Sequence, residues 1–362
     1  MKEINPHKFS KSKTDNAGDI LRNNNSSEND KNVALEILSN WRAAHNYPMH
    51  IFKKRLKWVS EKIDKKALSA QRLKRVPSII KKLNRKYGGN KATMKLTQMQ
   101  DIAGCRAVMS NVKLAKALYK DYYLRGDLKH KRVNEKDYIS HPKEDGYRSI
   151  HIIYKYNSDK GKKIYNDLLV EVQIRSKLQH IWATAVETVG FFIGQAIKSN
   201  EGEKEWNEFF KLMSSAFAKL ENCPIIPNTP NDERKLYLSI KKKEKELKVR
   251  TKLENWTKSI KFFDDLKNKK NLHFFLLELD TIQEKLTISA YSKRQEEKAI
   301  KDYALAEKKI YGRKEYDVVL VGADTTADLK KAYPNYFLDT KEFLIHLNKI
   351  LNKYSENENS TK

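Results

Sequence analysis

The chain has 362 residues, and its 73 Lys and Arg against 46 Asp and Glu give a formal net charge of +27. No apolar run reaches the roughly 18 residues of a membrane span, and the N-terminus lacks the apolar core of a secretory signal. Two cysteines, Cys105 and Cys223, are too few for a disulfide scaffold or a four-cysteine zinc site. We therefore expect a cytoplasmic protein of about two domains, with no zinc and a polyanionic partner.

The first two thirds of the chain mix helical and strand patterns after a polar start. Residues 1–32 are rich in Asn, Ser, Lys and Asp, which predicts disorder. Apolar residues then recur at helical spacing from Val33 to about Ala70, and another helix is expected over Pro77–Tyr87. Strands are predicted over Ile102–Met109, Leu128–Asn134, Ser149–Tyr156 and Leu168–Ile174, and helices over Leu114–Leu124, Ser176–Ile197 and Glu203–Leu220. This order fits an α/β (α+β) unit over residues 33–222, with one sheet flanked by helices.

Three prolines, at positions 224, 227 and 230, mark a boundary. A linker and one long charged helix over Glu233–Phe263 are predicted within residues 223–270, and a second, small α/β unit within residues 271–354. Its expected strands are His273–Asp280, Lys285–Tyr291 and Val318–Val321, and its expected helices are Lys293–Ile310, Leu329–Ala332 and Thr340–Lys353. Residues 355–362 are predicted to be disordered.

Two polar clusters occur where a strand meets a helix or a loop. The first, Arg72-x-Lys74-x-x-x-Ser78-x-x-Lys81-Lys82, gathers cations and a hydroxyl at a helix start, which suits a triphosphate or a solvated basic helix face. In the second, Asp101 opens the strand DIAGCRAV, which also carries Arg106. A carboxylate at that point is compatible with Mg²⁺ ligation or with a simple cap.

Two further clusters follow. The loop KDYISHPKEDGYRSIH, residues 136–151, combines cations with a tyrosine, which indicates base stacking and phosphate binding or a structural loop. The strand EVQIR places Glu171, Gln173 and Arg175 on one face. Glu171 could join Asp101 in a two-carboxylate Mg²⁺ site or act as a general base, and the residue pattern leaves both open.

Together, these clusters resemble the synthetase domain of the RelA/SpoT family, the alarmone synthetases. The resemblance covers about residues 50–220, in the order RLKRVPSIIKK, DIAGCRAV, KDYISHPKEDGYRSIH and EVQIRSKLQHIWA. It implies a nucleotidyltransferase-like mixed sheet flanked by helices. It also implies transfer of pyrophosphate from ATP to a ribose hydroxyl, with Mg²⁺ as the metal.

The resemblance also implies a role for each matching residue. Asp101 would bind Mg²⁺, and Glu171 would be the second carboxylate, as ligand or as activator of the attacking 3′-hydroxyl. The ATP phosphates would contact Arg72, Lys74 and Ser78, with Arg106 nearby. Tyr147 would stack on the acceptor base, and the rest of the acceptor side would consist of Lys136, Lys143, Arg148, His151, Gln173 and Arg175.

The sequence departs from the family pattern in ways that bear on the acceptor. Asp145 stands where Asn is usual, and Glu187 follows Trp182-Ala183 without the Glu-His of many small synthetases. Loss of that cation shifts the expectation from GDP or GTP toward another acceptor. The sequence also lacks the His-Asp pair of the family's hydrolase domain, so we expect synthesis without degradation.

The segment EYDVVLVGADTTADLKKAYPNYFLDTKEFL resembles the end of CapRel-type proteins, which fuse a toxic small alarmone synthetase to an antitoxin-like domain. The resemblance implies pyrophosphate transfer to the 3′-CCA end of tRNA, which stops translation. It also implies a C-terminal domain that is similar to a zinc finger without its cysteines and that senses a phage capsid protein. Tyr333 and Tyr336 would anchor this domain over the ATP side, or they could be ordinary core aromatics.

The charge of +27 suits tRNA, since phosphate contacts would dominate its binding. Basic residues in two predicted helices are candidate RNA contacts, or solvated faces: Lys53, Lys54, Arg55, Lys81, Lys82 and Arg85. Two alternatives stay open. One is a synthetase of (p)ppGpp or (p)ppApp that uses the same site, and the other is a non-catalytic RNA-binding protein.

Overall fold

The computed structural model describes residues 8–354 except 87–91, 127, 197–202, 260, 265–271, 281, 284, 311–312, 314–315, 324–328, 331–332, 334–336 and 338–339. Within these residues, nine strands form one mixed sheet in the order β3-β4-β5-β2-β1-β9-β7-β8-β6. The strands are β1 Leu68–Leu73, β2 Ala103–Met109, β3 Lys131–Asp137, β4 Ile150–Lys155, β5 Leu169–Ser176, β6 Lys261–Asp264, β7 Leu272–Asp280, β8 Lys285–Ser292 and β9 Tyr316–Gly322.

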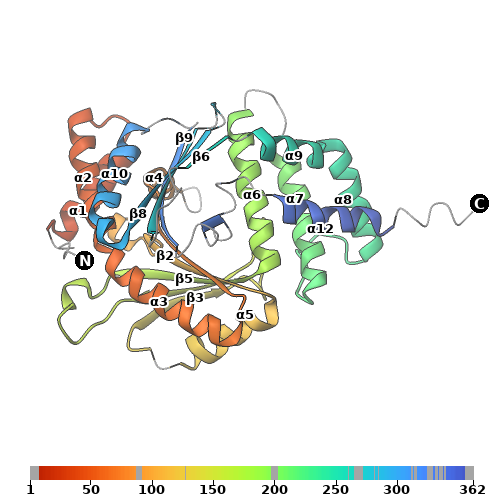
Figure 1. Ribbon diagram of the computed structural model, residues 1–362, viewed down its shortest axis with the longest axis horizontal. Helices are drawn as coiled ribbons and strands as arrows, with labels where there is room; N and C mark the ends of the chain where they lie inside the picture. The colour runs from red at the N-terminus through yellow and green to blue at the C-terminus, as the bar shows by residue number, and fades with distance from the viewer. Residues whose placement is uncertain are drawn as a thin grey trace, which may run out of the picture.

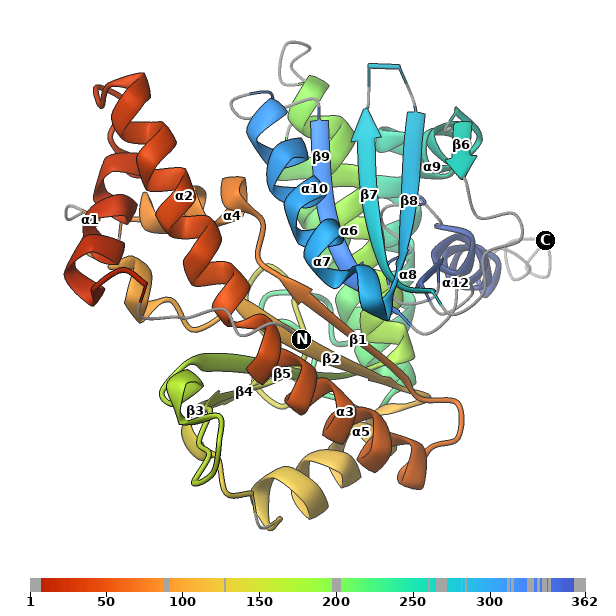
Figure 2. The same ribbon diagram turned by 60° about the vertical axis from the view of Figure 1, so that its left-hand side comes forward.

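The helices pack around this sheet (Figures 1 and 2). They are α1 Lys11–Arg22, α2 Glu28–Ala44, α3 Asn46–Ile63, α4 Val76–Leu83, α5 Val112–Leu118, α6 Lys177–Ala196, α7 Glu203–Leu220, α8 Glu233–Leu247, α9 Val249–Ser259, α10 Glu296–Lys309 and α12 Lys341–Asn352. Helices α3 and α5 pack on β1, β2 and β5, and α10 packs on β7 to β9. Helices α7, α8, α9 and α12 lie together at the end of the molecule near the C-terminus (Figure 1). None of the described helices is long and apolar enough to cross a membrane.

The register of the central strands decides which side chains share a face. Strand β2 runs parallel to β5, with Gly104 opposite Glu171 and Arg106 opposite Gln173. Strand β1 runs antiparallel to β2 and places Arg72 opposite Gly104. Because side chains alternate along a strand, the polar side chains of all three strands project from the same face. The alternate residues of β2 pack in the apolar cluster that includes α3.

The N-terminal segment differs from the prediction of disorder. Residues 11–22 form α1, whose start is capped by Ser10, with Lys13 N donating to Ser10 Oγ at 3.2 Å. Ala17 and Leu21 are buried in the main core. The prediction of disorder is wrong for residues 11–32, because a few apolar residues on one helix face are enough to dock a largely polar segment.

Two predicted helix boundaries are also wrong. The helix expected to reach Ala70 ends at Ile63, because the chain then turns and pairs as β1 with β2. The long helix expected over Glu233–Phe263 is divided into α8 and α9 at Lys248, whose φ of 53° is left-handed. A residue in that conformation ends a helix.

The C-terminal strands were predicted correctly, but they continue the N-terminal sheet. Strand β9 pairs antiparallel with β1, with Gln71 opposite Gly322 and Arg72 opposite Val321. Helix α12 packs away from these strands, since Phe343 and Leu347 belong to the apolar cluster of α6 to α9. The strands within residues 271–354 are therefore part of the single nine-stranded sheet and do not form a separate one. The expected likeness to a zinc finger stays a prediction.

Candidate active site

A polar pocket of about 150 Å³ lies on the face of β1, β2 and β5 that carries the polar side chains. It contains both predicted catalytic carboxylates and all four predicted ATP contacts. Its lining consists of Ala70, Gln71, Arg72, Lys74, Arg75, Ser78, Asp101, Gly104, Cys105, Arg106, His151, Glu171, Gln173 and Tyr333. The fold thus brings members of all four sequence clusters to one place, with His151 from the loop cluster, and it adds a tyrosine from the C-terminal part.

Asp101 lies just before β2, between two lysines. Its Oδ2 is 2.9 Å from Lys74 Nζ, and its Oδ1 is 2.9 Å from Lys82 Nζ. Burial would raise the pKa of Asp101, but the two ammonium groups outweigh it and lower that pKa below its ordinary value. Burial lowers the pKa of Lys74, and the ion pair with Asp101 offsets this in part. Asp101 is therefore an ionised carboxylate at neutral pH, and Lys82 contacts the site rather than open solvent.

Glu171, on β5, is held by two neighbours. The ring of His151 donates from Nδ1 to Glu171 Oε1 at 2.8 Å, and Gln173 Nε2 donates to Glu171 Oε2 at 2.6 Å. Burial would raise the pKa of Glu171, but the hydrogen bond and electrostatic interaction with His151 lower it below its ordinary value. Asp101 acts in the opposite sense on that pKa, so the two carboxylates lie close enough to interact. An ionised, oriented carboxylate of this kind can accept a proton.

A group of aromatic rings borders the pocket on the side of β4. With His151 donating from Nδ1, its Nε2 accepts from the hydroxyl of Tyr147 at 2.8 Å. The ring of Tyr138 lies edge-on to both, with centroids 6.1 Å from Tyr147 and 5.4 Å from His151. Lys143 Nζ lies 5.0 Å from the Tyr147 centroid and 4.5 Å from that of Tyr138. The stacking side chain expected in this loop is thus accompanied by Tyr138, which the sequence could have indicated because it lies in the same loop, two positions after Lys136.

The structure does not bring Arg148 to the pocket. This arginine is 4% exposed and donates to Ser214 Oγ, Ile139 O and Pro224 O at 3.1, 3.3 and 2.6 Å. Its guanidinium holds the loop against α7. The reason is local, because neighbouring residues of an extended chain point to opposite sides, so Arg148 points away from the side that Tyr147 faces.

Lys143, Tyr147 and two further predicted acceptor residues also lie outside the pocket lining. Arg175 follows Gln173 on the same face of β5, is 2% exposed and contacts His180 Nδ1. Burial, and then the nearby Arg106, lower the pKa of Arg175 to about 9. Lys136 is exposed on the edge strand β3, opposite His151 in the register.

The predicted RNA contacts divide by exposure. Lys54, Lys81 and Arg85 are exposed, and Arg55 is half-buried. Lys53 is only 9% exposed, because it lies on the buried side of α3, so it is not available on the surface. The exposed cations remain candidates for a polyanion.

Tyr333 is the residue of the C-terminal part that reaches the pocket. It is 2% exposed, and its hydroxyl donates to the backbone oxygen of Gln71 at 2.6 Å. Burial raises the pKa of Tyr333 to about 12, although Arg106 and Arg72 act against this shift. Tyr336 lies outside the described residues.

Carboxylates of α10 and β9 contact the start of α4 beside the pocket. Glu307 forms a buried ion pair with Arg42 of α2 and accepts from Val76 N at 3.0 Å. Asp317 forms an ion pair with Arg75, which itself lines the pocket. The C-terminal part is therefore fixed to the N-terminus of α4 by charge-assisted contacts.

The two site carboxylates fit a magnesium ion that shares its ligands with a substrate. In the part of the chain that the structure describes, no group of three or more His, Cys, Asp or Glu could hold a metal. The negative charges of Asp101 and Glu171 repel each other across the pocket, because Asp101 raises the pKa of Glu171. Mg²⁺ is usually bound by one or two carboxylates together with substrate phosphates, so the donor set suits it.

Comparison with known proteins locates the similarity in this same region. Residues 71–189 match the family model described as the region found in RelA / SpoT proteins. GTP pyrophosphokinase YjbM of Bacillus subtilis is 34% identical to this chain over 122 residues, which are 33% of this chain and 54% of that protein. The chain thus spans about half the length of this relative. The residues that match this RelA/SpoT-type region contain every pocket residue named above except Ala70 and Tyr333.

Solved structures with a similar arrangement come from small alarmone synthetases. Synthetase 2 of Bacillus subtilis shares 22% identity with a TM-score of 0.41, over 51% of this chain and 93% of that one. Synthetase 1 of the same organism, bound to its product pppGpp, shares 24% identity with a TM-score of 0.40, over 49% of this chain and 89% of that one.

Proposed function

We propose that this chain is an ATP-dependent pyrophosphotransferase of the RelA/SpoT type that modifies the 3′-hydroxyl of the tRNA CCA end and so blocks translation. One observation carries the transfer of pyrophosphate. Two ionised carboxylates, Asp101 and Glu171, meet the cations Arg72, Lys74 and Arg106 in one pocket inside the RelA/SpoT-type region. Transfer of a phosphoryl group requires positioning and neutralisation of charge, and this set of residues supplies both.

Each side chain then has a step that its position allows. Arg72, Lys74 and Ser78 bind the ATP phosphates beside the start of α4. Asp101, with Glu171 beside it, would hold the Mg²⁺ that neutralises phosphate charge. Glu171 accepts the proton of the attacking hydroxyl, whose oxygen forms a bond to the β-phosphorus of ATP. The bond between that phosphorus and the oxygen bridging to the α-phosphate breaks, and AMP leaves.

The hydrogen bonds to Glu171 hold its carboxylate in position to accept the proton of the attacking hydroxyl. His151 and Gln173 each occupy one carboxylate oxygen and fix its orientation. Tyr147, bonded to His151, presents its ring with Lys143 above it, as a platform for the acceptor base. Base stacking on an aromatic ring is the usual way in which proteins hold an unpaired nucleotide.

The proposal includes restraint by the C-terminal part, with release by a phage capsid-type protein. A pocket of about 150 Å³ is smaller than the roughly 300 Å³ at which ligand pockets begin. Tyr333 forms one wall of it, and the ion pairs of Glu307 and Asp317 hold that part in place. These contacts support a closed resting state that binding at the C-terminal part would open.

A second candidate differs in the acceptor. The relative named GTP pyrophosphokinase favours transfer to a free guanine nucleotide at the same site. The net charge of +27 and the exposed cations Lys54, Lys81 and Arg85 favour a polyanionic acceptor instead. The two candidates share every catalytic residue and are separated by the labelled product.

The test is one incubation of γ-³²P-ATP and Mg²⁺ with bulk tRNA, GDP, GTP and ATP. The full chain is compared with full-length Tyr333→Ala, which removes the wall of the pocket, and with Glu171→Gln. Label on tRNA that is lost when the 3′-CCA is removed is expected, stronger for Tyr333→Ala and absent for Glu171→Gln. Label on a free nucleotide would make the second candidate correct. If folded Tyr333→Ala labels nothing, the chain is better explained as a non-catalytic RNA-binding protein.

A further inference from the structure

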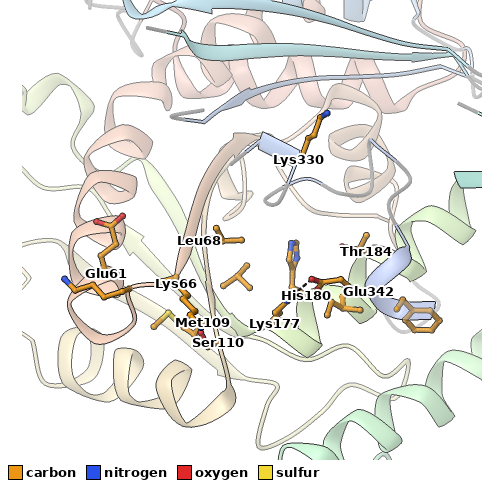
Figure 3. Close-up of a pocket in the computed structure, with 15 residues that line it drawn as sticks. Glu61, Lys66, Leu68, Met109, Ser110, Lys177, His180, Thr184, Lys330 and Glu342 are labelled. Carbon is orange, nitrogen blue, oxygen red and sulfur yellow. Dashed lines mark ion pairs between the residues drawn. The ribbon is translucent and has the colours of Figure 1, made fainter. Parts of the chain in front are cut away.

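A second cavity, of about 710 Å³, lies on the same face of the sheet as the pocket. It is bordered by the start of β1 and the end of β2, which meet because these strands are antiparallel. Helix α6 and the start of α12 close it on the other sides (Figure 3). Its lining shares no residue with the pocket that contains Asp101 and Glu171. It is a separate space that the proposed reaction does not use.

Cations enter this cavity from three parts of the fold. Lys65 and Lys66 lie in the turn between α3 and β1, Lys177 opens α6, and Lys330 comes from the C-terminal part. Figure 3 shows Lys66, Lys177 and Lys330 on different sides of the space. Among the described residues, only two carboxylates, Glu61 and Glu342, line the cavity in return. Four lysines against two glutamates make it electropositive at neutral pH.

The N-termini of α6 and α12 add to the positive electrostatic potential of the cavity. The first turns of α6 and α12 contribute Lys177 and Glu342 to the lining, and these helices are 20 and 12 residues long. A helix carries partial positive charge at its N-terminus. Lys177 Nζ pairs with Glu342 Oε1 at 2.7 Å, and both side chains are about half exposed, at 57% and 52%. An exposed pair of this kind is weak, so an anion can take over Lys177 at little cost.

The remaining wall is apolar. Leu68 of β1, Val108 of β2, Ile181 of α6 and Phe343 of α12 line the cavity between the lysines. A ligand that matches both surfaces has a flat apolar group and several negative charges. The volume also lies within the roughly 300–1,000 Å³ of known ligand sites. We propose that this cavity is a second binding site, for a nucleoside polyphosphate whose base packs on the apolar wall and whose phosphates contact Lys65, Lys66 and Lys330.

Photolabelling of the full chain tests the site directly. The probes are 8-azido-ATP and 8-azido-GTP, and the labelled peptides are identified by mass spectrometry. Label is expected on peptides that carry residues 61–68 or 177–184. The variant Lys65→Ala/Lys66→Ala should reduce this label by about tenfold, because it removes two exposed charged contacts. The matched control is Lys241→Ala/Lys242→Ala, two exposed lysines of α8, which should leave the label unchanged.

The outcomes separate this site from the proposed active site. Glu171→Gln should abolish pyrophosphate transfer and leave the label in the cavity unchanged, so each site is scored by its own readout. Label confined to peptides around Arg72 or Tyr147 would overturn the second site, as would the absence of any label on peptides of the cavity. Label in the cavity that persists in Lys65→Ala/Lys66→Ala would overturn the assignment of these lysines to the phosphates.

Discussion

Replacing Glu307 by Gln should weaken the contact between the C-terminal part and the rest of the fold. Glu307 pairs with Arg42 while 6% of its side chain is exposed, and 4% of the side chain of Arg42 is exposed. Its carboxylate also accepts from the hydroxyl of Tyr303 at 2.7 Å and from Val76 N at 3.0 Å. The amide keeps the shape of the side chain but removes its charge, so the guanidinium of Arg42 stays buried without a counter-ion.

The expected loss is large for one substitution. Removal of one partner of a buried ion pair costs about 3–5 kcal/mol, since the other charge remains without compensation. Removal of both partners costs less, because no buried charge is left. The double variant Arg42→Met/Glu307→Met should therefore be more stable than Glu307→Gln, and the pair should be strongly non-additive.

Urea unfolding followed by tryptophan fluorescence measures this loss. The chain has five tryptophans, and one of them, Trp41, is 8% exposed and adjacent to Arg42. The control is Asp159→Asn, which removes the exposed ion pair with Lys129 and should not shift the midpoint. A loss below about 1 kcal/mol for Glu307→Gln, the range of exposed pairs, would refute the reasoning. If the restraint proposed above holds, Glu307→Gln should also raise pyrophosphate transfer.

Three other predictions concern the pocket and the loop beside it. Gly146→Ala should lower the free energy of unfolding by about 1–3 kcal/mol, because φ is +96° there and a Cβ would lie 2.9 Å from Trp182. The control in the same urea assay is Gly161→Ala, because a Cβ at Gly161 would have no atom within 4 Å. The pKa of Asp101 is lowered by folding, so its stabilising effect is present above its unfolded value of 3.8 and is lost as pH falls through the lower folded value. Asp101→Asn should therefore lower the unfolding midpoint at pH 7 but not in strong acid, and a constant difference would contradict this. Glu171→Gln should reduce transfer in the ³²P assay at least a hundredfold, whereas near-normal turnover would exclude Glu171 as the base.

Apolar patterning predicted many of the local elements, among them the three strands β7, β8 and β9, but not β1 or α1. Strand β8 alternates apolar and polar residues, whereas β7 and β9 are short, mostly apolar runs, and each was expected within two residues of its observed bounds. The pairing of β9 with β1 was beyond this reasoning. It joins Arg72 to Val321, about 250 positions apart, and an alternating pattern does not say which edge a strand will join.

The site residues could be predicted where strand alternation or helical spacing determines which face of an element a side chain occupies. Glu171 and Gln173 share a face by alternation, and both line the pocket. Lys82 lies four positions after Ser78, so helical spacing places both residues on one side of α4. This agrees with the contact of Lys82 to Asp101 and not with its predicted role as an exposed RNA contact. The position of Arg148 depends on α7 and on the loop at Pro224, so no local pattern could locate its partners.

The start of α4 suggests why the C-terminal part would oppose binding of ATP. Arg75 lines the pocket, and the amide of Val76 opens a helix, so both favour an anion at this point. Asp317 and Glu307 already supply carboxylates to these two groups. A triphosphate entering the pocket therefore meets an arginine and a helix N-terminus whose positive charge is partly neutralised. Movement of β9 and α10 away from α4 would make Arg75 and the amide of Val76 available to the phosphates. It would also remove Tyr333 from the wall of the pocket, so one displacement would restore both the positive charge and the volume that ATP needs.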